Sequence, residues 1–380
     1  MDFSFSQDRE TLRTHIRELL DEVCTPEYAE RCDNDATPPR EAYQALAKHG
    51  WFGLILPVEY GGAGGSAIDL AILLEEAGRH FEELAMWLFR TLTYGGYAVM
   101  KHGTREQQDA MLPKVARGEL SFCFGLTEPH SGSDAAALAT KATAVDGGYV
   151  INGQKIFTSG MDISDYCLLV TRTSAQAKQQ QGITNFLVDT GLAGIEVRKI
   201  KTLGQRAIGT TQVFYTDVKV PPTAVLGEVD HGWDAVDSYL WYERLCLSAA
   251  RTGAATAAFD YALEYAKNRK QFGRPIGKFQ AISHKLADMK MMLDISRTLV
   301  YRFAWLMSEG KATRHDAAVL KLQTGEAYKT VSDLGLQILG GYGYCMDYPM
   351  QRFFRDSRLA VIGAGTSEIQ RNIIARGLGL

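Results

Sequence analysis

The sequence lacks any hydrophobic run long enough to cross a membrane, because no apolar stretch approaches about 18 residues. The first residues, MDFSFSQDRETL, contain neither a basic segment nor an apolar one, so we expect no signal peptide. Neither sign of charge dominates: 41 Lys and Arg stand against 44 Asp and Glu, for a net charge of −3. This balance argues against binding to nucleic acid or to an anionic membrane surface.

Closely spaced cysteines are also missing. The six cysteines lie far apart with no CxxC pair, which argues against a zinc site and against a disulfide framework and suits a reducing cytoplasm. The composition, 46% hydrophobic and 22% charged over 380 residues, is ordinary for a soluble globular protein and allows two or three domains. We therefore expect a cytoplasmic protein with no bound metal.

The spacing of apolar residues divides the chain into three parts and predicts an α+β fold. Residues 1–118 predict an N-terminal α-helical domain, because apolar residues recur at helical spacing in 10–23, 40–50, 67–80 and 105–118. Residues 119–228 predict a small antiparallel β domain of short strands, with a hairpin at Asp146-Gly147-Gly148. Residues 229–380 predict a C-terminal bundle of long helices. One of these carries a small-residue face (Ala249, Ala250, Gly253, Ala254 and Ala257) that suits close helix contact and an oligomer interface.

The segment VIGAGTSEIQR, residues 361–371, places nearly bare backbone before a helix start. Ser367 and Gln370 fit a capping box, and Gly363 and Gly365 allow another molecule to come close. Free N–H groups at a helix start favour an anion or a carbonyl oxygen. Taken by itself, a Gly-rich segment of this kind more often forms a loop that only turns the chain.

Two other segments could hold a ligand. LTEPHSGSD, residues 126–134, could bind a planar group through main-chain atoms and the hydroxyls of Thr127 and Ser133, or could be an ordinary turn. NRKQFGRPIGKFQ, residues 268–280, gathers cations at the end of a helix, which is favourable without any ligand. An aromatic ring at Phe272 beside an arginine would also suit a nucleotide diphosphate.

The order of these motifs resembles one family closely, the acyl-CoA dehydrogenases. LTEPHSGSD, NGQKIFTSG, RKQFGRPIGKFQ, QILGGYGY and GAGTSEIQR occur in the order and at the spacing of that family, over nearly the whole chain. Any one motif is weak, but five in register are highly specific. The first motif departs mildly, because His130-Ser131 stands where the family usually has Gly-Ala.

The resemblance implies an FAD enzyme with helical, β and helical domains, the last a four-helix bundle, usually assembled as a homotetramer. It implies that the flavin is lined from the middle domain, with Phe157 at a position where many relatives have Trp, and that FAD is also reached from the C-terminal domain across a subunit boundary. The cofactor residues implied are Phe124, Leu126, Thr127, Ser133, Phe157, Thr158, Ser159, Arg269, Phe272, Gln280, Gln337, Gly340, Gly341, Thr366 and Glu368. The substrate residues implied are Ser133, Tyr242, Arg244, Ala364 and Gly365.

Ala364 stands where many relatives carry the glutamate that removes the α-proton of the substrate. A methyl group cannot accept a proton. A minority branch of the family carries its base in a Glu-Arg-Leu context on the first long helix of the C-terminal domain, and this chain has Glu243-Arg244-Leu245 there. The resemblance therefore implies Glu243 as the catalytic base, with the backbone N–H of Ala364 retained to hold the thioester carbonyl. Arg244 is implied to support the substrate or the base, and a surface salt bridge is its other interpretation.

Three functions stay open on the sequence. The first is α,β-dehydrogenation of an acyl-CoA, with electrons passed to electron-transfer flavoprotein. The second is reduction of an enoyl-CoA, or the same chemistry on a carrier-protein thioester. The third is a non-catalytic family member that lost its base at Ala364. Tyr239, Trp241 and Tyr242 suggest a short or ring-bearing acyl group, although aromatic residues on a helix also build plain core.

Overall fold

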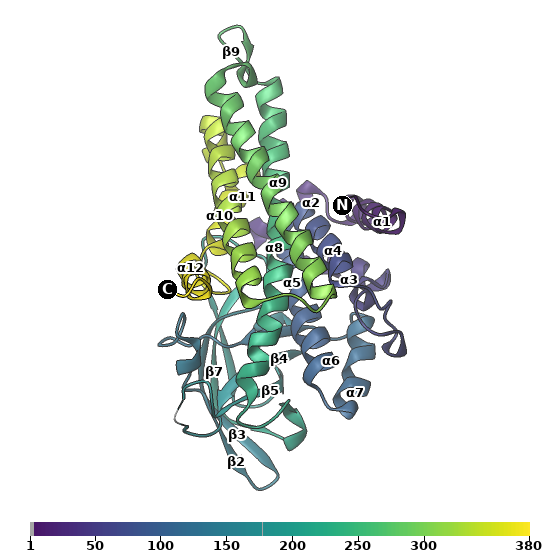
Figure 1. Cartoon of the computed structure of the whole chain (residues 1–380), viewed down its shortest axis with the longest axis vertical. Helices are drawn as coiled ribbons and strands as arrows, with labels where there is room; N and C mark the ends of the chain where they lie inside the picture. The colour runs from purple at the N-terminus through teal and green to yellow at the C-terminus, as the bar shows by residue number, and fades with distance from the viewer. Residues whose placement is uncertain (1–3, 177) are drawn as a thin grey trace.

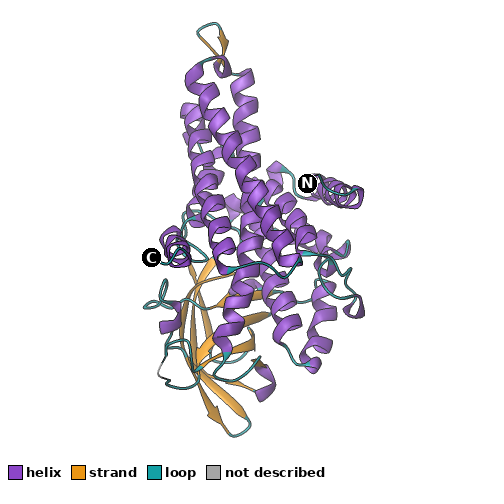
Figure 2. Cartoon of the chain, viewed as in Figure 1, coloured by secondary structure: helices purple, strands orange, loops and turns teal. Residues whose placement is uncertain are grey.

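A computed structural model describes residues 4–176 and 178–380 of the chain. The first three residues of the segment that predicts no signal peptide lie outside this range. Within it, no helix is both long and apolar enough to cross a membrane, and no group of three or more His, Cys, Asp or Glu side chains could hold a metal ion. Two helical regions flank a sheet, and the C-terminal helices extend as an arm away from it (Figures 1 and 2).

The N-terminal region is helical as the periodicity predicts. Its elements are α1 (Gln7–Val23), α2 (Pro26–Asp35), α3 (Arg40–Lys48), α4 (Ala67–His80), α5 (Glu82–Arg90), a π-helix (Thr91–Tyr97), α6 (Ala98–His102) and α7 (Arg105–Ala116). Helix α4 begins in a capping box formed by Ser66 and Asp69, and α7 begins in one formed by Thr104 and Gln107. These caps satisfy the free N–H groups that open each helix.

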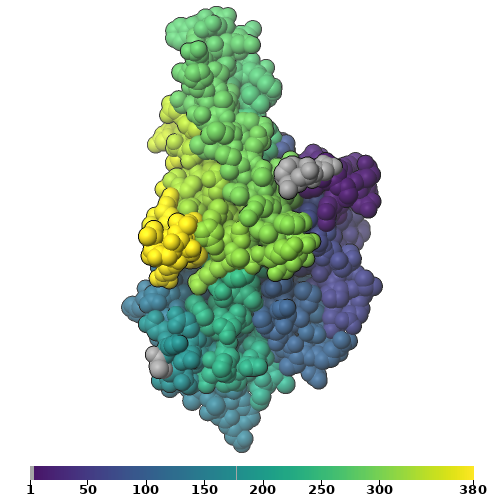
Figure 3. Space-filling view, in the orientation of Figure 1, coloured from purple at the N-terminus to yellow at the C-terminus, as the bar shows by residue number. Residues whose placement is uncertain are grey.

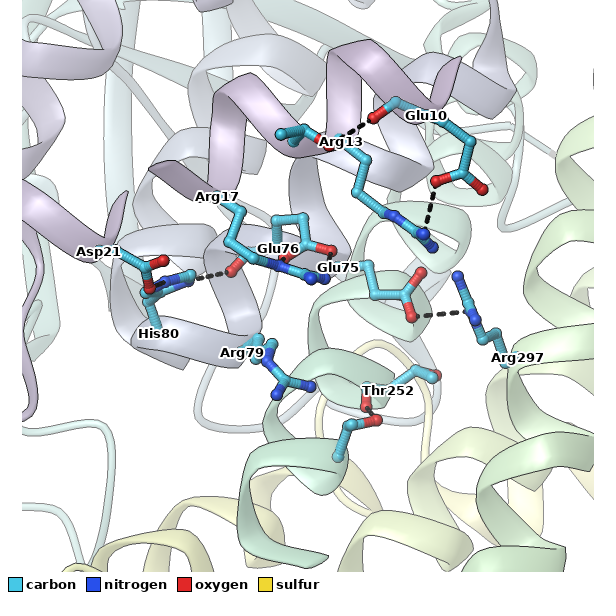
Figure 4. A network of polar contacts seen from close by, with 12 residues as sticks. Glu10, Arg13, Arg17, Asp21, Glu75, Glu76, Arg79, His80, Thr252 and Arg297 are labelled. Carbon is cyan, nitrogen blue, oxygen red and sulfur yellow. Dashed lines mark hydrogen bonds and ion pairs between the residues drawn. The ribbon is translucent and has the colours of Figure 1, made fainter. Parts of the chain in front are cut away.

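Ion pairs fasten α1 and α9 to α4 (Figure 4). Arg17 of α1 donates to both carboxylate oxygens of Glu76 at 2.9 and 2.6 Å. Arg297 of α9 pairs with Glu75 at 3.1 Å. These ion pairs therefore hold α1, α4 and α9 together.

The middle region is a single mixed sheet. Its strands are β1 (Phe122–Gly125), β2 (Lys141–Val145), β3 (Gly148–Ser159), β4 (Tyr166–Arg172), β5 (Ile183–Asp189), β6 (Ile195–Ile200), β7 (Thr210–Val220) and β8 (Val225–Leu226). They run in the order β6-β7-β3-β2-β4-β5-β8, and β1 pairs with β4. The predicted hairpin forms between β2 and β3, with Val145 opposite Gly148. The expectation of an antiparallel domain needs correcting, because β1 lies parallel to β4 over its whole length.

The C-terminal region is a helical bundle. It comprises α8 (Gly232–Asn268), the short hairpin of β9 (Lys270–Gln271) and β10 (Arg274–Pro275), α9 (Gln280–Ser308), α10 (Arg314–Leu339), α11 (Met350–Ala360) and α12 (Ser367–Gly377). The hairpin and the helix ends around it form the far end of the arm, which we call the bundle tip (Figures 1 and 3).

The small-residue face of α8 packs inside the chain. A Cβ added at Gly253 would lie 2.0 Å from the carbonyl oxygen of Glu75, and one added at Gly78 would lie 2.1 Å from that of Ala250. Helices α4 and α8 are therefore so close that only glycine fits at the crossing. This face does not support the predicted oligomer interface, because α4 of the same chain covers it.

Candidate active site

Glu243 lies in the first third of α8 (Gly232–Asn268). Its side chain is buried, at 8% exposure, and its Oε2 atom has no hydrogen-bond partner among the described residues. Burial raises the pKa of Glu243, while Arg244 and a hydrogen bond from Tyr94 oppose the rise. An acidic side chain with a raised pKa and a free oxygen is the form in which a carboxylate serves as a general base.

Three arginines, Arg90, Arg244 and Arg251, interact with the charge of Glu243. Arg90 and Arg251 both act on the charge of Glu243, and Arg251 also lies 3.9 Å from Glu82. Arg244 is buried, and its Nε and Nη1 atoms find no hydrogen-bond partner in the described chain. A buried guanidinium group without a partner is costly, so the surface-salt-bridge interpretation of Arg244 does not fit its position.

Aromatic rings pack around Tyr94, the tyrosine that hydrogen-bonds to Glu243. Tyr94 stacks on Phe124 with ring centroids 4.6 Å apart, and both rings meet Tyr239 edge to face. Tyr97 stacks on Tyr242 at 4.2 Å. The predicted substrate residue Tyr242 is therefore a buried, stacked ring, as its core interpretation requires.

Tyr94 and Tyr97 were not found from the sequence. They belong to the π-helix at Thr91–Tyr97, a rare element that occurs mostly at functional sites. Its wider turn places the Tyr94 hydroxyl toward Glu243. The sequence offers no signal for a π-helix, since the two glycines in TLTYGGY are equally suited to a turn.

The segment 361–366 forms a turn before α12 that leaves backbone groups free. Ala364 has a φ of 57° and Gly365 a φ of 81°, both in the left-handed region. Ala364 packs against the large core cluster to which Tyr239 and Tyr242 belong. The helix cap differs from the prediction by one residue: Thr366, not Ser367, accepts the hydrogen bond from the N–H of Ile369.

The turn after β1 is held by a buried ion pair. Lys155 donates to Glu128 at 2.8 Å and to the carbonyl of Leu126 at 3.0 Å, and Ile156 N–H donates to the carbonyl of Thr127 at 2.9 Å. These bonds fix the backbone of LTEPHSGSD against β3. The backbone of this segment is therefore held in place by hydrogen bonds to β3.

The middle-domain residues predicted to line a cofactor lie along β1, β3 and the turn. Phe157 adopts a positive φ of 56° and is 61% exposed, which is unusual for a large apolar side chain. The hydroxyl of Thr158 is buried without a hydrogen-bond partner in the described residues. Ser159 contacts Thr210 at 3.2 Å, and Ser133 is exposed in its loop.

A second group of predicted cofactor residues lies at the bundle tip. Arg269, Phe272 and Gly341 line a groove of about 730 Å³. Phe272 is 94% exposed. Gln280 opens α9, while Gln337 and Gly340 lie at the end of α10. Figure 1 shows the tip at the opposite end of the molecule from the strands, so one chain does not bring the two groups together.

Three family models cover the chain almost end to end. The acyl-CoA dehydrogenase N-terminal domain matches residues 6–119, the middle domain 123–218 and the C-terminal domain 230–379. The chain belongs to the acyl-CoA dehydrogenase family. The helix, sheet and bundle architecture predicted from that resemblance is confirmed. This acyl-CoA dehydrogenase family member is an oxidoreductase.

Individual family members match over their full length. The 3-(aryl)acrylate reductase of Clostridium sporogenes is 36% identical over 98% of this chain and 99% of its own. The short-chain-specific acyl-CoA dehydrogenase of Clostridium acetobutylicum is 34% identical over 99% of both chains. The structure of butyryl-CoA dehydrogenase from Megasphaera elsdenii aligns with a TM-score of 0.95 at 32% identity and 100% coverage of both chains.

Proposed function

We propose that the chain is an FAD-dependent enzyme that dehydrogenates an acyl-CoA to a 2-enoyl-CoA, with Glu243 as the base that removes the α-proton. The observation that carries this proposal is the buried carboxylate of Glu243, whose Oε2 is unpartnered in the described chain. Ala364 leaves the family's other base position without a carboxylate. Glu243 is then the carboxylate that we propose meets the substrate.

The protein lowers the barrier to deprotonation in two ways. An α-hydrogen beside a thioester is weakly acidic, so the enolate that forms must be stabilised where its charge appears, on the carbonyl oxygen. The backbone N–H of Ala364 supplies a donor for that oxygen. Glu243 accepts the proton, and burial makes it a stronger base than a solvated glutamate. Arg244 and Arg90 offset the cost of keeping Glu243 ionised.

The residues of the middle domain fit the isoalloxazine part of FAD. The fit rests on the exposed ring of Phe157, the unpartnered hydroxyl of Thr158 and the backbone held by Lys155. When bound, FAD supplies the acceptor for the β-hydride at N5. Phe124, Leu126, Thr127, Ser133 and Ser159 complete this lining.

The other end of FAD is proposed to lie on a second copy of the chain. Arg269 makes no ion pair within the described residues but stacks over Tyr342 at 5.5 Å, leaving its cation free for a diphosphate. The groove beside it can take the nucleotide. Gln280, Gln337 and Gly340 adjoin in sequence the residues Phe279, Ile338 and Gly341 that line this groove. Thr366 and Glu368, at the start of α12, complete the cofactor set. In a homotetramer built as a dimer of dimers, one copy of the chain would bind the isoalloxazine end of FAD and a second copy would bind the nucleotide end. Electron-transfer flavoprotein is the proposed partner.

A second candidate function is reduction of an enoyl-CoA. The 36% identical relative from Clostridium sporogenes is named a reductase, which favours this direction as a real alternative. The same residues serve both directions, because each step is reversible. A carrier-protein thioester in place of CoA, and a non-catalytic role, stay as the remaining alternatives.

The experiment is anaerobic reduction of the bound flavin by a panel of saturated acyl-CoAs, from short to long, branched and aryl-bearing. Loss of the flavin absorbance with formation of the matching enoyl-CoA supports the dehydrogenase. Reoxidation of chemically reduced protein by enoyl-CoAs, without reduction by any saturated one, supports the reductase. A protein that holds FAD but reacts with neither class, as CoA or carrier thioester, contradicts both.

A further inference from the structure

The turn at Ala364 is held from behind by two buried side chains. The Nζ atom of Lys321, on α10, lies 2.6 Å from the carbonyl oxygen of Gly365. The Nε2 atom of Gln370, on α12, lies 3.0 Å from the same oxygen and 3.2 Å from the carbonyl oxygen of Ala364. Both side chains have 0% exposure. Two elements from different parts of the chain therefore converge on one carbonyl.

A buried lysine without a carboxylate partner needs an explanation. Within the described residues Lys321 forms no ion pair, and the charges acting on it from α8 include the cations Arg244 and Arg251. Burying an ammonium group beside other cations costs stability, so the position is not explained by fold stability alone. Among the described residues, the one hydrogen bond of the Lys321 side chain is the bond to Gly365.

The bond to Gly365 restrains the turn that contains Ala364. Ala364 and Gly365 both hold left-handed φ angles, which cost energy for a residue with a side chain. Holding the carbonyl oxygens of Ala364 and Gly365 toward α10 and α12 fixes the two peptide planes that follow Ala364, and with them the backbone of the turn that carries the Ala364 N–H. A Cβ at Gly365 would lie 2.7 Å from Nε2 of Gln370, so the turn is also packed tightly against this support.

We propose that Lys321 is a positioning residue for the oxyanion donor: its ammonium group holds the Gly365 carbonyl so that the N–H of Ala364 points at the thioester oxygen. The inference rests on the proposed function. Lys321 touches neither substrate nor cofactor, and it acts through the turn. The Lys321 side chain also lies close enough to Glu243 on α8 to interact with its charge.

The test separates α-deprotonation from hydride transfer. In a 3-thiaacyl-CoA, sulfur replaces the β-carbon, so the ligand can lose its α-proton to the base but has no β-hydrogen to transfer. The enolate beside oxidised flavin is seen as a long-wavelength absorbance band. We would titrate FAD-loaded protein with 3-thiabutanoyl-, 3-thiaoctanoyl- and (phenylthio)acetyl-CoA.

Lys321→Met keeps the length of the side chain and removes its donor. We expect it to bind FAD and the thia ligand within a few-fold of the parent protein, but to form about 10- to 100-fold less enolate at equal pH, since a misplaced oxyanion donor costs up to this much. Lys329→Met, on the same helix but partly exposed and paired with Glu326, is the control and should leave the band unchanged. An unchanged band in Lys321→Met overturns the proposal.

Hydrogen exchange gives a reading that does not depend on the chemistry. The amides of residues 361–367 should exchange about 10-fold or more faster in Lys321→Met than in the parent or Lys329→Met protein. If the parent forms no enolate with any thia ligand, the proposed function fails, and unchanged exchange would then reject the role of Lys321 separately. If Lys321→Met does not fold, Gln370→Leu takes its place, because it removes the second donor to the Gly365 carbonyl. This variant must show the same loss of enolate. An enolate absorbance band of parental intensity in Gln370→Leu rejects the proposal.

Discussion

Lys155 and Glu128 form a buried ion pair 2.8 Å long between β3 and the turn that follows β1. The carboxylate also accepts the N–H groups of Ala139 at 2.6 Å and Thr140 at 2.8 Å. One side chain thus ties together the two motifs, LTEPHSGSD and NGQKIFTSG, that are proposed to line the flavin. The lysine in the second motif explains how the first keeps its shape.

Lys155→Met should weaken FAD binding about 10-fold. The reason is that the variant loses the charge-assisted bonds to Glu128 and Leu126, worth roughly 1.5–3 kcal/mol to the position of the turn. The measurement is the dissociation constant of FAD on reconstitution of apoprotein. Lys219→Met, an exposed lysine on β7, is the matched control. Equal FAD affinity in both variants would show that the turn does not line the cofactor.

Phe272→Glu should dissociate the assembly, because the ring is 94% exposed at the bundle tip and a carboxylate cannot be buried against a second copy without a partner. We expect the parent to have about four times the 42.0 kDa chain mass by light scattering. The variant should fall to a smaller species and lose FAD with it. Lys285→Glu, at a partly exposed position on α9, is the control for added charge. A monomeric parent with FAD bound contradicts the shared site.

Tyr94→Phe should move the pH profile of turnover upward. The hydrogen bond from Tyr94 lowers the pKa of Glu243 against the rise caused by burial. Removing it raises the pKa further, so the ionised base appears only at higher pH and the ascending limb of kcat/KM shifts to that side. Tyr43→Phe, a buried tyrosine bonded to Thr91, controls for loss of a hydroxyl. A shift to lower pH, or none, would contradict the contact.

Glu83→Gln should stabilise the protein at alkaline pH. Burial raises the pKa of Glu83 to about 8, and Asp356 adds to the rise. Between the ordinary pKa of 4.5 and this value the folded state holds a proton that the unfolded state has released, so stability falls as pH increases through this window. The amide does not titrate.

The gain from Glu83→Gln should therefore be roughly 1–3 kcal/mol larger at pH 8.5 than at pH 5. Thermal melts of the parent, this variant and Glu228→Gln, an exposed glutamate, at both pH values measure it. A gain that is the same at both pH values would show that the carboxyl titrates normally in the folded protein.

Periodicity was sufficient for much of the fold. The pattern over 67–80 predicts α4 with the ends the structure has, and Asp146-Gly147-Gly148 predicts the hairpin, because both signals are local. The parallel pairing of β1 with β4 depends on residues about 40 apart and has no local sign. The boundaries 1–118, 119–228 and 229–380 stay a prediction.

The site was predictable only where a motif marks it. Glu243 and Ala364 stand at recognisable family positions. Tyr94 and Lys321 do not, because their roles arise from contacts between helices far apart in sequence. The π-helix that carries Tyr94 packs tightly against β1, since a Cβ on Gly95 would lie 2.2 Å from the ring of Phe122.

Glu243→Gln tests the central claim, that the base lies on α8 and not on the loop at Ala364. The amide has the shape of the carboxyl group, so we expect the variant to keep its fold, FAD and thioester binding. It should lose turnover by roughly 10²- to 10⁴-fold or more. The double variant Glu243→Ala with Ala364→Glu should regain part of this loss, because both positions aim at one α-carbon, and only part, because a displaced base is less well oriented.

The decisive measurement is the rate of anaerobic flavin reduction by substrate in the parent, the Glu243→Gln variant and the double variant. The account predicts a fast parent, a Glu243→Gln protein slowed by at least about 10²-fold and a double variant between the two. Flavin reduction at the parental rate in Glu243→Gln would contradict the account and place the base elsewhere.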